Sequence, residues 1–271
     1  IETTVTPKTQ SSATIEPIEI NVSITNSATN TAPISPTWTP HPTLSAADAQ
    51  EKILELLKDN NGCDLPCWWG IMPGKTNWAE AETFLDTLSP NIIDLGNDKY
   101  GVTFKNLPNN ISGGAIGATI SINNDVVQII RADIYYQLPV ILKKYGVPSE
   151  IWIFADHQSL NSAMPFTIAL IYIDQGILAV YNGESSKTEE TKICPVQQTG
   201  FQTAWLLWNP ELGFSFYDAG RTLLLFENQP EDRPFYRLEK VSNLDVATFQ
   251  KTYIHSENEG ICFDLIKVDD Q

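Results

Sequence analysis

The stretch that decides the fold is residues 166–183, "FTIALIYIDQGILAVYNG". Two apolar runs, both rich in β-branched and aromatic residues, stand on either side of the short sequence Asp174-Gln175-Gly176. Strands that are joined by three to five residues including a glycine form β-hairpins. The stretch therefore predicts an antiparallel hairpin, and the rest of the chain is interpreted outward from it.

Further strand-like runs lie on both sides of this hairpin. Before it, residues 114–122 and 125–134 are separated by the turn sequence "NND" and predict a second hairpin. Other short apolar runs are strand candidates, at residues 100–106, 151–156, 203–209, 213–218, 222–228 and 260–268. So many strands with few helices between them favour an antiparallel sheet.

Two helices are predicted ahead of the strands. Residues 46–58 carry an apolar stripe, and Ser45 followed by Asp48 has the spacing of a capping box. Residues 77–88 predict a second helix with Asn77 as its N-terminal cap. The sequence "DNNG" between the two helices ends the first one.

Two more helices are predicted among the strands. The first lies in residues 138–150, "LPVILKKYGVPSE", with Gly146 at the position that follows its end. The second lies in residues 242–253, where Ser242 and Asp245 have the spacing of a capping box. Short helices among antiparallel strands define an α+β fold, with helices packed on one face of the sheet.

The order helix, hairpin, helix, hairpin suggests two related halves. We place the first at residues 45–158 and the second at residues 159–271. An extended arm of residues 1–44 precedes both. About half of the arm is Thr, Ser or Pro, a composition that cannot bury enough apolar surface to fold alone.

Part of the arm nevertheless has the pattern of a β-strand. Within residues 18–25 the apolar residues alternate with polar ones, which is the two-residue period of a half-buried strand; they are Ile18, Ile20, Val22 and Ile24. Residues 35–45, "SPTWTPHPTLS", predict an extended, semi-rigid spacer after it. The strand pairs either with a neighbouring subunit or with the sheet of its own chain, and the sequence leaves both open.

Composition restricts the compartment and the partners. Charged residues make up only 18% of the chain, so Asn, Gln, Ser and Thr supply much of the polar surface, as suits a secreted or cell-surface protein. The formal net charge of −16 disfavours nucleic acid and anionic membranes as partners. No apolar run reaches the length of a membrane span. The start at Ile1 is interpreted as that of a processed product without a lipid-bearing cysteine.

The four cysteines predict two disulfides. Their spacing matches no zinc pattern, and an even number in a secreted chain is typical of disulfide bonding. Three pairings are possible; we favour a local bridge and a long one, Cys63–Cys67 and Cys194–Cys262. A redox-active pair normally has the spacing Cys-x-x-Cys, and "CDLPC" has one residue more.

The sequence contains no recognisable catalytic motif. The histidines His41, His157 and His255 are far apart and match no metal motif. "DNNGCD" at residues 59–64 resembles part of a calcium loop, but its spacing favours a helix-ending turn. The glycine-rich "SGGAIG" at residues 112–117 precedes a strand and is interpreted as a turn. A glycosidase carboxylate pair cannot be selected among 33 acidic residues. We expect no enzyme, no cofactor and no metal.

Seven tryptophans are many for a chain of this length. Most are expected in the core, because indole rings bury large apolar areas. Trp68 and Trp69 are adjacent in a predicted loop, so a second interpretation makes them an exposed platform on which a glycan stacks.

The segment around these tryptophans resembles a known pattern. Its elements are a Cys-x-x-Pro-Cys-Trp loop and a Gly-x-x-Pro-Gly-x-Thr turn, made here by Cys63, Pro66, Cys67, Trp68, Gly70, Pro73, Gly74 and Thr76. Together with the Thr/Pro-rich arm and the later "YGVPSE" at residues 145–150, it resembles secreted proteins of filamentous, chloroflexus-like bacteria. The arrangement is also faintly similar to outer-membrane assembly lipoproteins and β-lactamase inhibitor proteins. Both resemblances imply binding or structure rather than catalysis.

The function expected from the sequence is therefore that of a non-enzymatic, extracellular structural or adhesive surface protein. Its arm strand would add to the sheet of a neighbouring copy, and such head-to-tail contacts would produce a filament. The alternative is a monomeric secreted module that binds or inhibits a protein or glycan. The expected partners are copies of the chain itself, then glycans or other surface proteins.

Overall fold

The structure is a computed structural model that describes residues 43–105, 107–108, 115–156, 163–186, 192–195, 203–226, 235–255 and 261–266. The chain divides into two units, residues 1–40 and residues 41–271, and every described residue belongs to the second. The predicted arm strand lies outside the described residues, as do His41 and His157.

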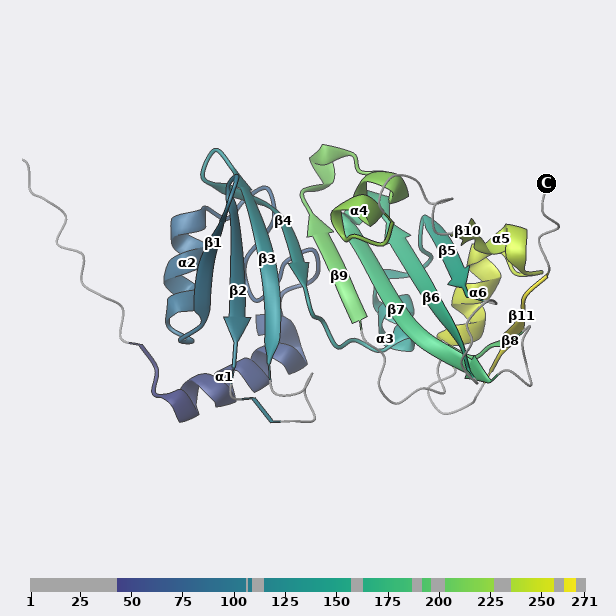
Figure 1. Ribbon diagram of the computed structural model, residues 1–271, viewed down its shortest axis with the longest axis horizontal. Helices are drawn as coiled ribbons and strands as arrows, with labels where there is room; N and C mark the ends of the chain where they lie inside the picture. Colours follow the sequence, from purple (N-terminus) through teal and green to yellow (C-terminus); the bar gives the residue numbers. More distant parts are fainter. Residues whose placement is uncertain are drawn as a thin grey trace, which may run out of the picture. The chain divides into compact units, whose positions relative to one another are not determined.

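The described residues build one nine-stranded antiparallel sheet (Figure 1). Its order is β1-β2-β3-β4-β9-β7-β6-β5-β10. The bounds of its strands are β1 (Asn91–Gly96), β2 (Lys99–Phe104), β3 (Ile116–Asn123), β4 (Val126–Ala132), β5 (Glu150–Ala155), β6 (Ala163–Tyr172), β7 (Ile177–Ser186), β9 (Thr203–Trp208) and β10 (Tyr236–Arg237).

The hairpin predicted at residues 166–183 is confirmed as β6 and β7. The two strands pair along their whole length, from Ala163 with Ser186 to Tyr172 with Ile177. Gly176 closes the turn in the left-handed region, and a Cβ there would come within 2.1 Å of the carbonyl oxygen of Trp208. Only glycine therefore allows the turn to pack this closely against β9.

Strands from both predicted halves belong to the same sheet. β4 pairs with β9 from Ile129 with Trp208 to Ala132 with Trp205. β5, which precedes residue 158 in the chain, lies between β6 and β10. The two segments are thus joined by a continuous ladder of backbone hydrogen bonds, while their proposed relatedness stays a prediction.

The α+β class is confirmed by the helices around the sheet. The α-helices are α1 (Ala46–Asp59), α2 (Trp78–Asp86), α3 (Leu138–Tyr145), α4 (Phe216–Thr222), α5 (Leu238–Val241) and α6 (Val246–Tyr253). Single 3-10 turns are η1 (Asn60–Gly62), η3 (Ile173–Gln175) and η5 (Pro210–Leu212). A separate pair of short strands, β8 (Lys192–Ile193) and β11 (Phe263–Asp264), takes the place of the longer closing strand predicted at residues 260–268.

Helices cover both faces of the sheet, not one as predicted. One core cluster packs α1, α2, α3 and α6 against a face that runs from β2 to β5. On the opposite face, a second cluster packs α4 against β5, β6, β7 and β9. This second cluster reaches Ile129 of β4 but contains no residue of β1, β2 or β3.

The two strands predicted at residues 213–218 and 222–228 are wrong for the described residues. Residues 216–222 form α4, and residues 223–226 form a turn. The Ser215 hydroxyl accepts the Asp218 N–H, and the Asp218 carboxylate accepts the Ser215 N–H, so a complete capping box starts the helix. The buried residues of α4, Phe216, Ala219 and Gly220, have the spacing of one helix face.

Two predicted caps also need correction. Ser45 caps α1 as expected, by accepting the Asp48 N–H. Asn77 stands at the N-cap position of α2 but its side chain makes no capping hydrogen bond. α6 is capped by Asp245, which accepts the Thr248 N–H, whereas Ser242 instead donates to the Leu238 carbonyl of α5.

Candidate interaction sites

The calcium-like sequence at residues 59–64 and His255 are the two metal-binding candidates among the described residues, and neither belongs to a cluster of metal-ligating side chains. Within the part of the chain that the structure describes, no group of three or more His, Cys, Asp or Glu side chains could hold a metal. Asp59 accepts the Asn61 N–H, and Asp64 forms an ion pair with Lys144 at 2.5 Å. "DNNGCD" is thus the predicted helix-ending turn, in which η1 follows α1. His255 is exposed after α6.

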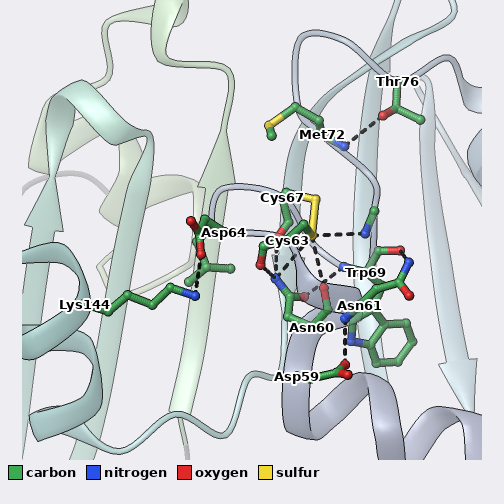
Figure 2. The surroundings of a disulfide bond; sticks show 12 residues. Asp59, Asn60, Asn61, Cys63, Asp64, Cys67, Trp69, Met72, Thr76 and Lys144 are labelled. Atoms are coloured by element: carbon green, nitrogen blue, oxygen red, sulfur yellow. Dashed lines mark hydrogen bonds and ion pairs between the residues drawn. A yellow bond between two sulfur atoms is a disulfide. The ribbon is translucent and has the colours of Figure 1, made fainter.

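The loop that follows is organised around one buried amide, that of Asn60 (Figure 2). Asn60 ends α1 in the left-handed conformation. Its Nδ2 donates to the carbonyls of Cys63 (2.8 Å) and Cys67 (2.7 Å), and its Oδ1 accepts the Trp69 N–H (2.9 Å). The predicted Cys63–Cys67 disulfide closes the same loop. Three backbone groups and one covalent bond therefore hold the loop in a single arrangement.

The interpretation of Trp68 and Trp69 as an exposed glycan platform is wrong. Both side chains are 2% exposed. Their rings stack on each other at 4.4 Å, and Trp69 also lies 5.3 Å from the Phe104 ring of β2. Both indoles belong to the first core cluster, which packs α1, α2, α3 and α6 against the sheet.

The tryptophan loop is also attached to α3, far away in the sequence. Tyr145 Oη accepts the Leu65 N–H at 2.9 Å, beside the Asp64–Lys144 ion pair. Burial raises the pKa of the Tyr145 hydroxyl above its ordinary value. The "CDLPC" loop and the "YGVPSE" element, which the sequence paired only by resemblance, are therefore in direct contact at this point.

The turn after the loop is attached to the sheet. Met72 donates its N–H to the Thr76 hydroxyl (2.8 Å), which fixes the "MPGKT" turn. Gly74 and Thr76 then exchange backbone hydrogen bonds with Val127 of β4, at 2.7 and 2.9 Å. The polar groups of this turn thus bind one another and the backbone of β4.

The second predicted disulfide, Cys194–Cys262, joins the ends of β8 and β11. It links residues 68 positions apart in the sequence. Both pairings favoured from the sequence are therefore confirmed. Two disulfides are typical of proteins in an oxidising compartment such as the cell exterior.

The two ends of the sheet differ in what they expose. β10 is two residues long, and its Arg237 is engaged by Glu150 at 2.5 Å and lies 5.5 Å above the Trp152 ring. β1 has six residues and exposes two large apolar side chains, Ile93 (50%) and Leu95 (54%).

The sequence analysis missed β1. The signal was present as "NIIDLG" followed by Asn97 and Asp98, which both adopt positive φ in the tight turn to β2. The run was overlooked because a single charged residue, Asp94, and a terminal glycine interrupt its apolar character.

Comparison of the chain with known protein families, with curated proteins and with solved structures found no match. Among the described helices, none is long and apolar enough to cross a membrane.

Proposed function

We propose that this chain is a non-enzymatic, extracellular structural or adhesive surface protein whose copies assemble into a filament through the N-terminal arm. The alternating residues 18–25 would add as a strand to the sheet of a neighbouring copy. Each copy would then donate one strand and accept another, and a contact of this kind continues from copy to copy unless rotation closes it into a ring.

The observation that carries this proposal is that the sheet is open. Its nine described strands end at β1 and β10, which have one neighbour each in that sheet. The end strand of a sheet presents backbone N–H and C=O groups to any strand that approaches. A chain that has both an open edge among its described strands and a strand pattern in its arm has the two parts that strand addition requires.

Two further observations support the extracellular and non-catalytic parts of the proposal. The two disulfides would form and persist in an oxidising environment. In and beside the tryptophan loop, the polar groups of Asn60, Asp64 and Tyr145 bind backbone groups and Lys144 of the same unit. Such contacts make a rigid scaffold.

The test compares the oxidised full-length protein with a variant lacking residues 1–30. We expect the full-length protein to form assemblies that grow with concentration, and the deletion variant to stay a monomer, as measured by sedimentation velocity and electron microscopy. A variant lacking only residues 1–14 keeps the alternating strand and serves as the control, which should still assemble. If all three proteins are monomers of equal behaviour, the filament proposal fails and the monomeric binding module replaces it.

A further inference from the structure

We propose that β1 is the acceptor edge, and that it binds residues 18–24 of a second copy with their apolar side chains against Ile93 and Leu95. This inference rests on the proposed function and adds the place of the contact. The argument considers in turn the backbone of β1, its apolar face and the route of the arm.

The backbone of β1 is long enough and sufficiently open to pair with a further strand. β1 pairs with β2 from Asn91 with Thr103 to Gly96 with Lys99, and no other described strand of the sheet lies on its far side. A strand of six residues matches the seven residues of the arm pattern in length. β10 offers only two residues, and one of them, Arg237, forms an ion pair with Glu150. Backbone length thus favours β1 over β10.

Ile93 and Leu95 form an apolar surface on the face of β1 that the second core cluster does not reach. Ile93 pairs with Gly101 of β2, and the Leu95 side chain lies 3.5 Å from the position that a Cβ of Gly101 would occupy. Leu95 therefore lies over Gly101 of β2, on the same face as Ile93. Roughly half of each side chain is exposed there.

A strand added at β1 would cover this surface. In a two-residue period, Ile18, Ile20, Val22 and Ile24 all fall on one face of the added strand. Cross-strand pairs of β-branched and other apolar side chains stabilise adjacent strands. The alternate residues of the arm are polar and would fall on the face of the exposed Asp94 and of the partly buried Ile92, which packs against the first core cluster. The apolar residues of the arm thus match the exposed apolar face of β1.

The length of the spacer is sufficient for the arm to reach a second copy. The Leu44 N–H donates to the Thr87 carbonyl at 3.1 Å, which fixes the start of the described chain beside the end of α2, shortly before β1. Residues 35–45 are rich in proline, and a spacer of that composition extends by about 3.1 Å per residue, or roughly 34 Å in total. This length exceeds that of β1 itself, which is about 20 Å, so a spacer of this kind is long enough to reach the β1 edge of a neighbouring copy.

The experiment traps the contact in the full-length protein. Val22→Cys and Ile93→Cys are made in separate chains, which are mixed and mildly oxidised. We expect a disulfide-linked dimer of the two variants. Val22→Cys mixed with Arg237→Cys is the matched control, because Arg237 lies at the opposite edge; this mixture should give no link. Peptide mapping verifies that both native disulfides remain.

Each outcome separates the inference from the proposed function. A link between positions 22 and 93 of different chains, without one between 22 and 237, supports both. If assemblies form without that link, β1 of a second copy is not the acceptor. Loss of assembly in Ile93→Asp with the arm intact gives an independent readout, and unchanged assembly would overturn the inference. If the unaltered protein does not assemble, the proposed function itself fails.

Discussion

Asn60 satisfies three backbone groups of the tryptophan loop with one side chain. Its conformation is left-handed, which asparagine tolerates better than most residues. The hydrogen bonds to the Cys67 carbonyl and from the Trp69 N–H are buried, so removing the amide leaves these two groups without their partner in the core. The residue therefore links the end of α1 to the position of Trp69 in the core.

Asn60→Ala is expected to lower the free energy of unfolding by about 2 kcal/mol more than Asn61→Ala, since it leaves the buried Trp69 N–H and two carbonyls without a partner. Asn61 is a matched control: it is exposed, also has positive φ, and its amide makes only a 3.5 Å contact to the Trp69 carbonyl. Urea denaturation of the oxidised proteins measures the difference. Equal losses would show that the amide network does not stabilise the loop.

At the scale of elements, local hydrogen bonding determines that residues 216–222 form the helix α4 and not a strand. The run at residues 213–218 is apolar enough for a strand, but the capping box of Ser215 and Asp218 satisfies the first helical N–H groups. Sequence patterns identified the longer elements, such as the hairpin of β6 and β7 and the helix α1, because their periodicity extends over many residues. In α4, of seven residues, the periodicity is too short to separate helix from strand.

Ser215→Ala is expected to destabilise the protein by about 1 kcal/mol, and Ser215→Thr, which keeps a hydroxyl, by less. The Ser215 hydroxyl and N–H hold the pKa of the Asp218 carboxyl below its ordinary value. Stability from a lowered pKa is present above the ordinary pKa of Asp and is lost as the pH falls through the folded-state value. The cost of Ser215→Ala should therefore shrink in strong acid.

Denaturation at pH 7 and at low pH measures this effect, and a carbon-detected NMR titration follows the carboxyl itself. In Ser215→Ala the pKa of Asp218 should rise toward the ordinary value, because the hydroxyl hydrogen bond to the charged form is lost while the one from the backbone N–H remains. An unchanged titration curve would mean that the capping box does not persist in solution.

For the whole molecule, two features hold distant segments together: the β4–β9 ladder and the Cys194–Cys262 disulfide. The ladder unites strands from both sides of residue 159 into one sheet, whose two faces are covered by different helices. The disulfide fixes the β8–β11 pair, which has only two residues in each strand. So short a pair depends on covalent closure more than on its few hydrogen bonds.

Replacing both Cys194 and Cys262 with Ser is expected to cost on the order of 4 kcal/mol, against about 2 kcal/mol for the same change at Cys63 and Cys67. The Cys194–Cys262 disulfide spans 68 residues and the Cys63–Cys67 disulfide spans four. Closing a longer loop removes more entropy from the unfolded chain. Guanidinium denaturation of the two double variants measures the order. A larger loss at the short bridge would show that its contacts, rather than loop closure, dominate.

The α+β class, the β6–β7 and β3–β4 hairpins, the start of α1 and both disulfide pairings could be predicted from the sequence. These depend on local periodicity, turn residues and cysteine spacing, which neighbouring residues encode. The tertiary structure alone decided that Trp68 and Trp69 are buried, that helices cover both faces, and that β1 ends the sheet with Ile93 and Leu95 exposed. Burial and strand order arise from contacts between residues far apart in the chain, and no local pattern specifies which of two apolar surfaces will be covered.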